Sequence, residues 1–414
     1  MNQALKEISK VDFEKIRKDF PVLHQDVNGR PIVYLDNAAS SQMPVQVAER
    51  IDHYHRYEHS NVHRGIHTLS QKATDAFEET RFKVQKLINA SDPDEIIYTT
   101  GTTDSINLVA NSYGSKFLKE GDEIILTQME HHANIVPWQM IAEKTGARIK
   151  VIPVSDSGDL DMDAYKKLLS SKTKIVAIVH ISNALGTVNP VKEITELAHE
   201  TGAVVLVDGA QSVPHQKVDI QDIDADFFAF SSHKMCGPTG FGILYGRKSI
   251  LDQMPPYRGG GDMIDKVSFE GTTYNRVPFR FEAGTPPIAA SIGLSKAIDY
   301  LNEIGMDNIA QREFELVTYL VDRLKEIDGL KLIGEPVNRA SLASFILDDI
   351  HASDVGTLLD KQGVAVRTGH HCAQPILRRF NVPATTRASL SFYNTKKDVD
   401  RLIDGIKEVK SFFQ

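Results

Sequence analysis

The chain has 414 residues, of which 41% are hydrophobic and 25% are charged, and its formal net charge is −8. This composition is typical of a soluble globular protein with two or three domains and a large buried core. The acidic balance argues against nucleic acid and anionic membranes as partners, and no apolar run reaches the about 18 residues of a membrane span. Two cysteines without CxxC spacing, and an N-terminus without a signal-peptide pattern, predict a cytoplasmic protein without disulfides.

Short apolar runs alternate with longer amphipathic runs from about residue 93 to residue 245. The apolar runs predict strands at 95–100, 123–127, 148–154, 174–182, 203–208 and 226–231, and the amphipathic runs predict helices at 103–118, 133–146, 161–170 and 190–202. This alternation predicts an α/β fold with a mostly parallel sheet covered on both faces. The run at 240–246 predicts one more strand, which could be antiparallel.

Residues 255–287 are rich in Gly and Pro and have weak periodicity, which predicts long ordered loops of the kind that usually carry function. Helical spacing resumes over 287–327. Strands are then expected at 341–347, 364–369 and 387–393, with a helix near 353–362 and another at the C-terminus. We therefore predict a large α/β domain over residues 25–295, and a smaller α+β domain over residues 1–24 and 296–414.

Polar residues follow several predicted strands, where ligands bind in open α/β sheets. Thr102 and Thr103 open a helix after Gly101, so free backbone N–H groups, the helix dipole and two hydroxyls could bind a phosphate. An ordinary helix cap is the alternative. Asp208 ends a very apolar strand, where a carboxylate needs a cation as partner. That partner could be nucleotide-bound Mg²⁺, a protonated ring nitrogen, or simply a salt-bridging or capping group.

Lys234 follows another apolar strand, and a lysine near a buried sheet has a lowered pKa and can form a Schiff base. A surface lysine is the alternative. Pyridoxal phosphate would explain these features together, since it needs a lysine for its aldehyde, an acid for its ring nitrogen and a cup for its phosphate. His131 could stack on the ring and Gln211 could donate to its hydroxyl. The phosphate could be bound by Thr102, Thr103, Ser231 and His233.

The segment "RTGHHCAQP", residues 367–375, places Cys372 in a polar setting, although most cysteines are buried. Arg367, His370 and His371 would favour its thiolate if they are charged and close. A bystander thiol in a turn is the alternative. Cys236, the other cysteine, is expected to be a packed small residue.

The sequence resembles the group II, or SufS-type, cysteine desulfurases in the class V branch of fold-type I pyridoxal phosphate enzymes. The resemblance covers almost the whole chain, through "YLDNAASSQMP", "SNVHRGIHTLS", "TGTTDSINLVA", "MEHHANIVPWQ", "HISNALGT", "DGAQSVPH", "SSHKMCGPTGFG", "FEAGTPP" and "RTGHHCA". It implies the aspartate aminotransferase-like fold, with a mostly parallel seven-stranded sheet, and the conversion of L-cysteine to L-alanine. It also implies the cofactor roles given above for Lys234, Asp208, Gln211, His131 and the phosphate-binding residues.

The resemblance further implies that Cys372 receives sulfur as a persulfide and that Asn183, Arg387 and Arg367 bind the substrate. His131 is also a candidate catalytic residue, as a proton carrier for the substrate thiol. In a homodimer, Thr285 would reach the phosphate of the neighbouring subunit. His63 and Arg64 resemble positions near the site or the dimer contact. The sulfur would pass to an acceptor protein for iron–sulfur cluster assembly. In the branch of the family that is served by a zinc-bearing, SufU-like acceptor, a histidine lies nineteen residues before the catalytic cysteine. Here that residue is Ser353, so we expect a SufE-like acceptor instead.

Five other functions are weighed against this one. A zinc hydrolase could use His131, His132 and the histidines beside Cys372, but adjacent histidines rarely share one metal, and we expect no metal site. An aminotransferase or a kynureninase-like hydrolase would not need Cys372, whereas a selenocysteine lyase could keep its activity without it. A non-catalytic scaffold would not need the full set of cofactor residues.

Overall fold

The computed structural model describes residues 11–413, and its centre is a seven-stranded sheet. The strand order is β4-β10-β9-β8-β7-β5-β6, and only β10 runs antiparallel to its neighbours. The strands are β4 (Ile96–Thr99), β5 (Glu123–Thr127), β6 (Arg148–Ile152), β7 (Thr173–Val179), β8 (Val204–Asp208), β9 (Phe227–Ser231) and β10 (Gly242–Gly246). The predicted α/β fold of the pyridoxal phosphate fold-type I class is confirmed, including the antiparallel option for 240–246.

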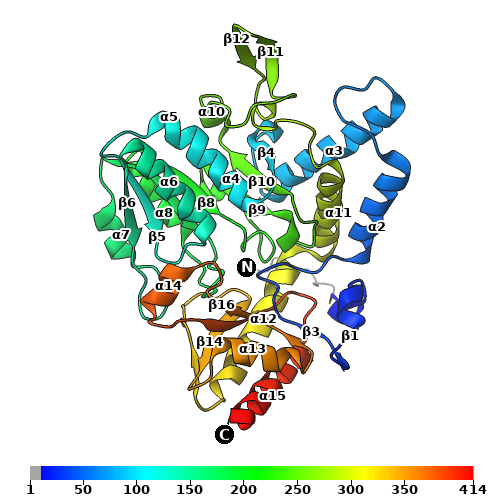
Figure 1. Cartoon of the computed structure of the whole chain (residues 1–414), viewed down its shortest axis with the longest axis vertical. Helices are drawn as coiled ribbons and strands as arrows, with labels where there is room; N and C mark the ends of the chain where they lie inside the picture. The colour runs from blue at the N-terminus through cyan, green and yellow to red at the C-terminus, as the bar shows by residue number, and fades with distance from the viewer. Residues whose placement is uncertain (1–10, 414) are drawn as a thin grey trace, which may run out of the picture.

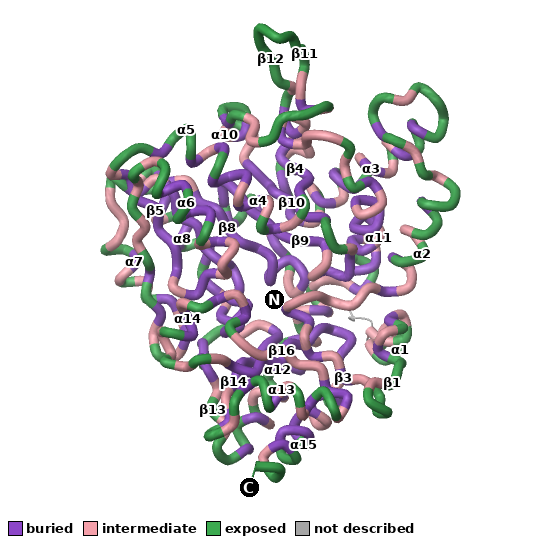
Figure 2. Tube along the Cα trace, in the orientation of Figure 1, coloured by how far each residue is buried: buried purple, intermediate pink, exposed green. Residues whose placement is uncertain are grey.

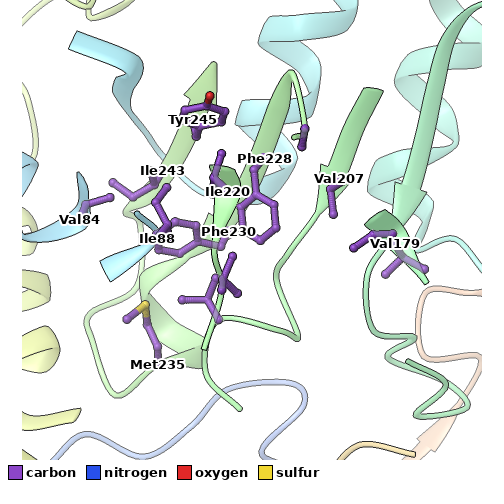
Figure 3. Packing of buried hydrophobic residues seen from close by; sticks show 14 of the residues in the cluster. Val84, Ile88, Val179, Val207, Ile220, Phe228, Phe230, Met235, Ile243 and Tyr245 are labelled. Atoms are coloured by element: carbon purple, nitrogen blue, oxygen red, sulfur yellow. The ribbon is translucent and has the colours of Figure 1, made fainter. Parts of the chain in front are cut away.

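Helices cover both faces of this sheet (Figure 1). Alternate residues of one strand enter opposite hydrophobic clusters: Phe228 and Phe230 pack in one, and Phe227 and Ala229 in the other. Figure 3 shows Phe228 and Phe230 beside side chains from neighbouring elements. The covering helices are α3 (Thr68–Leu87), α4 (Thr102–Val109), α5 (Ser115–Phe117), α6 (Val136–Thr145), α7 (Met162–Leu168), α8 (Val191–Glu200), α9 (Ile220–Ile223), α10 (Lys248–Leu251) and α11 (Ile288–Ile304).

A second, antiparallel sheet with strand order β13-β14-β17-β16 lies in the lower part of Figure 1. Its strands are β13 (Leu330–Leu332), β14 (Leu342–Leu347), β16 (Arg367–Gly369) and β17 (Thr385–Ser389). The accompanying helices are α12 (Met306–Lys325), α13 (Ala352–Asp360), α14 (Gln374–Arg379) and α15 (Lys396–Phe413). A third hydrophobic cluster joins this sheet to α12, α13 and α15. Arg387, expected to open its strand, lies in the middle of β17.

The N-terminal part of the chain contacts both sheets. Its elements are α1 (Phe13–Arg17), α2 (Val45–His53), β1 (Asp26–Val27), β2 (Arg30–Pro31) and β3 (Val33–Tyr34). Strand β3 pairs in parallel with β15 (Val364–Ala365), although more than 300 residues separate them. The predicted domain boundary at residue 295 falls inside α11, and residues 1–10 lie outside the described part, so the division into two domains stays a prediction.

The Gly- and Pro-rich segment 255–287 is not entirely loop. It contains a hairpin of β11 (Ile264–Ser268) and β12 (Gly271–Tyr274), which pair only with each other and project from the body (Figure 1). The hairpin is almost wholly exposed (Figure 2), so its strands lack the apolar alternation by which a half-buried strand is recognised. Across residues 11–413, no helix has the length and apolar character needed to cross a bilayer. The cytoplasmic location stays a prediction.

Candidate active site

A cavity of about 170 Å³ lies where the parallel strands of the large sheet end. Ten of the predicted site residues line it: Thr102, Thr103, His131, Asn183, Asp208, Gln211, Ser231, His233, Lys234 and Arg367. A second cavity of about 650 Å³ shares Thr102, Thr103, Ser231 and His233 with the first. Of the remaining predicted residues, Arg387 and Cys372 contact residues of the first cavity, whereas Thr285 is exposed and lines neither.

Lys234 and Asp208 lie on the same cavity and carry opposite charges. Asp208 is the last residue of β8, and Lys234 ends the short helical turn η6 (Ser232–Lys234) after the neighbouring strand β9. Burial lowers the pKa of Lys234 to about 8, although the Asp208 carboxylate acts in the opposite direction. Burial raises the pKa of Asp208, while the Ala210 N–H, at 3.0 Å, and the Lys234 charge lower it. The site therefore holds a lysine amine that loses its proton easily, with a carboxylate near it.

The start of α4 forms a cup between two strands. Gly101 precedes the helix at φ 146, and the Thr102 N–H and hydroxyl both bond to Ser231 Oγ, at 2.8 and 2.7 Å. A Cβ atom on Gly242 of β10 would lie 2.4 Å from the Gly101 Cα, so only glycine permits this close approach. Free N–H groups at a helix N-terminus, with hydroxyls beside them, suit a phosphate.

Sequence analysis assigned no role to Asp104, Tyr257 or Arg258, which lie at the second cavity. The Tyr257 hydroxyl donates to Asp104, and the Arg258 guanidinium lies 2.6 Å from the same carboxylate. These contacts fix the long segment after β10 against the first turn of α4. No spacing rule could have found them, because about 150 residues separate the partners.

His131 lies at the turn after β5 and lines the first cavity. Its Nδ1 accepts the Ala133 N–H at 3.0 Å, which assigns the ring proton to Nε2. Burial, and next the charge of Lys234, lower the pKa of His131 to about 4. The ring is therefore neutral at pH 7, as suits a group that stacks on an aromatic cofactor.

Arg387 is completely buried beside the first cavity. Its guanidinium donates to the Asn183 carbonyl at 2.8 Å and pairs with Asp36 at 2.9 Å, while its Nε–H has no partner among the residues that the structure describes. Burial lowers its pKa to about 10. Arg367 of β16 is the residue directly opposite Arg387 of β17. Like charges so placed repel, and an anion between them would relieve that repulsion. Sequence analysis missed Asp36, within the quoted "YLDNAA" segment, because nothing in that pattern pointed to an arginine about 350 residues away.

Cys372 sits in a tight turn at the edge of the site. His371 and Cys372 have φ values of 51° and 55°, in the left-handed region that non-glycine residues rarely adopt. The Arg367 guanidinium contacts the Cys372 Sγ at 3.7 Å. His371 does not contribute a charge: it is buried against Thr385, and burial lowers its pKa to about 2.

Other predicted residues have structural surroundings. Cys236 packs in the hydrophobic core, as predicted, and burial raises its pKa to about 12. His63 contacts Glu78 at 2.9 Å and Arg64 pairs with Asp262. Neither His63 nor Arg64 lines either cavity. The Gln211 side chain donates to the Ala38 carbonyl at 2.7 Å and faces the first cavity.

The residues around these cavities fit pyridoxal phosphate. The cup at α4 suits its phosphate, Lys234 its aldehyde and the buried Asp208 its ring nitrogen, and two buried polar atoms, Arg387 Nε and Asn183 Oδ1, have no partner within residues 11–413. Unpaired buried groups are costly and are expected where a ligand binds. Over those same residues, no group of three or more His, Cys, Asp and Glu side chains is arranged to hold a metal ion.

Comparison with known proteins agrees with this architecture. The chain belongs to the aminotransferase class-V family, whose model matches residues 33–402. Its relatives within that family include cysteine desulfurases. A probable cysteine desulfurase of Halalkalibacterium halodurans is 54% identical over 399 residues, covering 96% of this chain and 98% of the relative. The cysteine desulfurase of Haloferax volcanii is 50% identical over 418 residues, covering 97% and 98%. The crystal structure of the cysteine desulfurase CsdA from Escherichia coli has a TM-score of 0.91 at 39% identity, covering 97% and 99%.

Proposed function

We propose that the protein is a pyridoxal phosphate-dependent cysteine desulfurase, a sulfurtransferase that converts L-cysteine to L-alanine and keeps the sulfur on Cys372. One observation carries the proposal: Lys234 and Asp208 line one cavity, and Cys372 contacts Arg367 of that same cavity. An aminotransferase or hydrolase would have no use for a thiol there. The similarity to cysteine desulfurases is consistent with this activity.

The roles of the basic and acidic residues follow from their surroundings. The cofactor supplies an electron sink that stabilises negative charge on the substrate carbon. Lys234 would hold the cofactor aldehyde and, once displaced by the substrate amine, accept the Cα proton at Nζ, for which a pKa of about 8 is suitable. Asp208 would keep the ring nitrogen protonated. His131 would stack on the ring, and Gln211 would bond its oxygen.

The substrate carboxylate would bind between Arg387, Arg367 and Asn183. The Arg387 Nε–H has no partner within residues 11–413, the two guanidinium groups carry like charges that an anion would neutralise, and the Asn183 amide nitrogen can donate to the carboxylate. This orients the substrate sulfur toward Cys372. The Cys372 thiolate forms a bond to that sulfur as the Cβ–S bond breaks, and the electron pair of the broken bond stays with carbon. Protonation of that carbon gives the methyl group of alanine, so the products are alanine and a Cys372 persulfide.

Mass spectrometry of the holo-protein after incubation with L-cysteine tests this proposal. We expect a gain of one sulfur atom (about 32 Da by composition, on the thiol chemistry of persulfidation) on the peptide that contains Cys372. The peptide of buried Cys236 is the internal control. Cys372→Ser should abolish alanine production from cysteine. Alanine production that survives this change would contradict the assignment, and would favour a selenocysteine lyase or another class V activity.

We further propose that the enzyme is a homodimer that supplies sulfur for iron–sulfur cluster assembly. Exposure of Thr285 outside both cavities of its own chain supports a role in the neighbouring subunit. A SufE-like acceptor remains favoured over a SufU-like one, because Ser353 stands at the position where the SufU-served branch has a histidine. The nearby His351 caps its own helix by accepting the Ser353 N–H. Mixing the enzyme with each acceptor type and measuring alanine decides this, and stimulation by the zinc-bearing acceptor alone would refute it.

A further inference from the structure

Two hydrogen bonds join His132 to the turn that carries Cys372. The His132 main-chain N–H donates to the Cys372 carbonyl at 2.7 Å, and the Gln374 N–H donates to the His132 ring Nε2 at 3.1 Å. His132 belongs to the turn η5 (His132–Asn134), which follows β5. It thus holds the main chain on both sides of Ala373, the residue after Cys372. Nothing in the desulfurase roles above uses this histidine.

The Cys372 turn needs such support. Two consecutive non-glycine residues, His371 and Cys372, have positive φ, and each such residue costs about 1–3 kcal/mol unless its surroundings impose it. A turn under this strain relaxes when its contacts are lost. The thiol would then move away from Arg367 and from the cavity.

The other contacts of the turn do not replace His132. Asn183 donates to the His371 carbonyl at 2.6 Å, and the His371 ring bonds to Thr385 at 2.7 Å, so both reach residue 371 only. The Ala373 N–H donates to the His370 carbonyl at 2.9 Å, which closes the turn on itself, and Arg367 contacts the Cys372 sulfur from the small sheet. Asn183 is also the residue proposed to bind the substrate carboxylate. If its amide turned to the substrate, the contact with His371 would be lost, and His132 would be the main support of the turn on the large-sheet side.

The ring of His132 is suited to this contact. Burial, and next the neighbouring His370, lower its pKa, so the ring is neutral at pH 7 and Nε2 can accept a hydrogen bond. The residue before it, His131, lines the cofactor cavity. The same turn therefore presents one ring to the cofactor and holds the thiol loop with the next.

We propose that His132 is a positioning residue for Cys372, holding the strained 371–374 turn so that the thiol faces the substrate sulfur. The proposal rests on the desulfurase function proposed above. It predicts that the acceptor atom of residue 132, rather than the imidazole as such, is what matters.

Three variants of the holo-protein test this. Gln places its Oε1 as many bonds from Cα as the histidine Nε2, so His132→Gln can keep the contact, whereas His132→Asn is one bond too short and His132→Ala has no acceptor. We expect the Ala and Asn variants to lose about tenfold in kcat for alanine formation, with KM for cysteine unchanged, as one hydrogen bond used in positioning predicts. His132→Gln should retain activity within about threefold, by the same reasoning.

A second measurement does not depend on desulfurase activity. The rate at which iodoacetamide alkylates Cys372, followed by mass spectrometry without substrate, should rise several-fold in the Ala and Asn variants but not in the Gln variant. The exposed His24→Ala is the control for loss of a histidine. The proposal would be overturned if His132→Ala kept the kcat and the alkylation rate of the wild type. It would also be overturned if all three variants lost kcat equally. If the wild type makes no alanine from cysteine, the proposed function fails, while alkylation still reports on the turn. Unchanged cofactor absorbance identifies folded variants.

Discussion

Burial shifts the acidic and basic groups of the site in opposite directions. It lowers the pKa of Lys234 and of His131, and raises that of Asp208, because low polarity disfavours the charged form of each. His132 and His371 also have lowered pKa values. The basic group in contact with the Cys372 sulfur is the Arg367 guanidinium, at 3.7 Å.

The pKa of Lys234 predicts how the apo-protein takes up its cofactor. Only the neutral amine attacks an aldehyde, so the rate of attachment should rise with pH and level off above about 8, the pKa of Lys234. Stopped-flow absorbance of apo-protein mixed with pyridoxal phosphate between pH 6 and 10 measures this. A free lysine derivative, with a pKa of about 10.4, is the control, and its rate should still be rising at pH 10. If the attachment rate of the protein also still rose at pH 10, the Lys234 amine would not have the lowered pKa that burial causes.

At the scale of elements, the site depends on strands that end at the same edge and on one strand that reverses. Strand β10 runs antiparallel between β4 and β9, which brings Gly242 against Gly101 at the start of α4. In the second sheet, the register of β16 and β17 sets Arg367 opposite Arg387. The first arrangement shapes a cup for a phosphate, and the second a place for a carboxylate.

Gly242→Ala tests the close approach of β10 to α4. The new Cβ would lie 2.4 Å from the Gly101 Cα and 2.7 Å from its N, so backbone must move. We expect a loss of about 1–3 kcal/mol in the free energy of unfolding, as for overpacked sites, and weaker binding of pyridoxal phosphate. Urea denaturation and cofactor titration measure both. Gly271→Ala in β12, where a Cβ meets no atom within 4 Å, should change stability by less than about 0.5 kcal/mol. Equal effects of the two changes would show that the approach is not critical.

At the scale of the whole molecule, large apolar side chains remain exposed on the hairpin and on the segment between α2 and α3. Phe269 at the hairpin tip and Ile66 before α3 are both almost fully exposed. Figure 2 shows both segments as exposed stretches at the end of the molecule opposite the small sheet. Such exposure is expected where a second copy of the chain covers the surface.

Ile66→Asp tests the proposed dimer. A charge in place of an apolar side chain at an interface should raise the dimer dissociation constant by at least about tenfold. It should also weaken cofactor retention, because Thr285 of the partner would be lost. Light scattering after size-exclusion chromatography measures the first effect. Val337→Asp, also exposed but in the loop between β13 and β14, is the control. If the wild type is a monomer, or if Ile66→Asp leaves the dimer dissociation constant unchanged, the surface around Ile66 is not a dimer interface.

The sequence by itself determined the α/β fold and the residues at strand ends. Buried parallel strands are continuous apolar runs, so a polar residue that ends such a run, as Asp208 does, or closely follows one, as Lys234 does, stands out without a structure. Only the tertiary structure decided which of these residues meet and what supports them. Arg387 with Asp36, and His132 with the Cys372 turn, are contacts across about 350 and 240 residues, set by the pairing of strands and the packing of turns. Local pattern carries no information about such contacts, because they depend on the whole chain having folded.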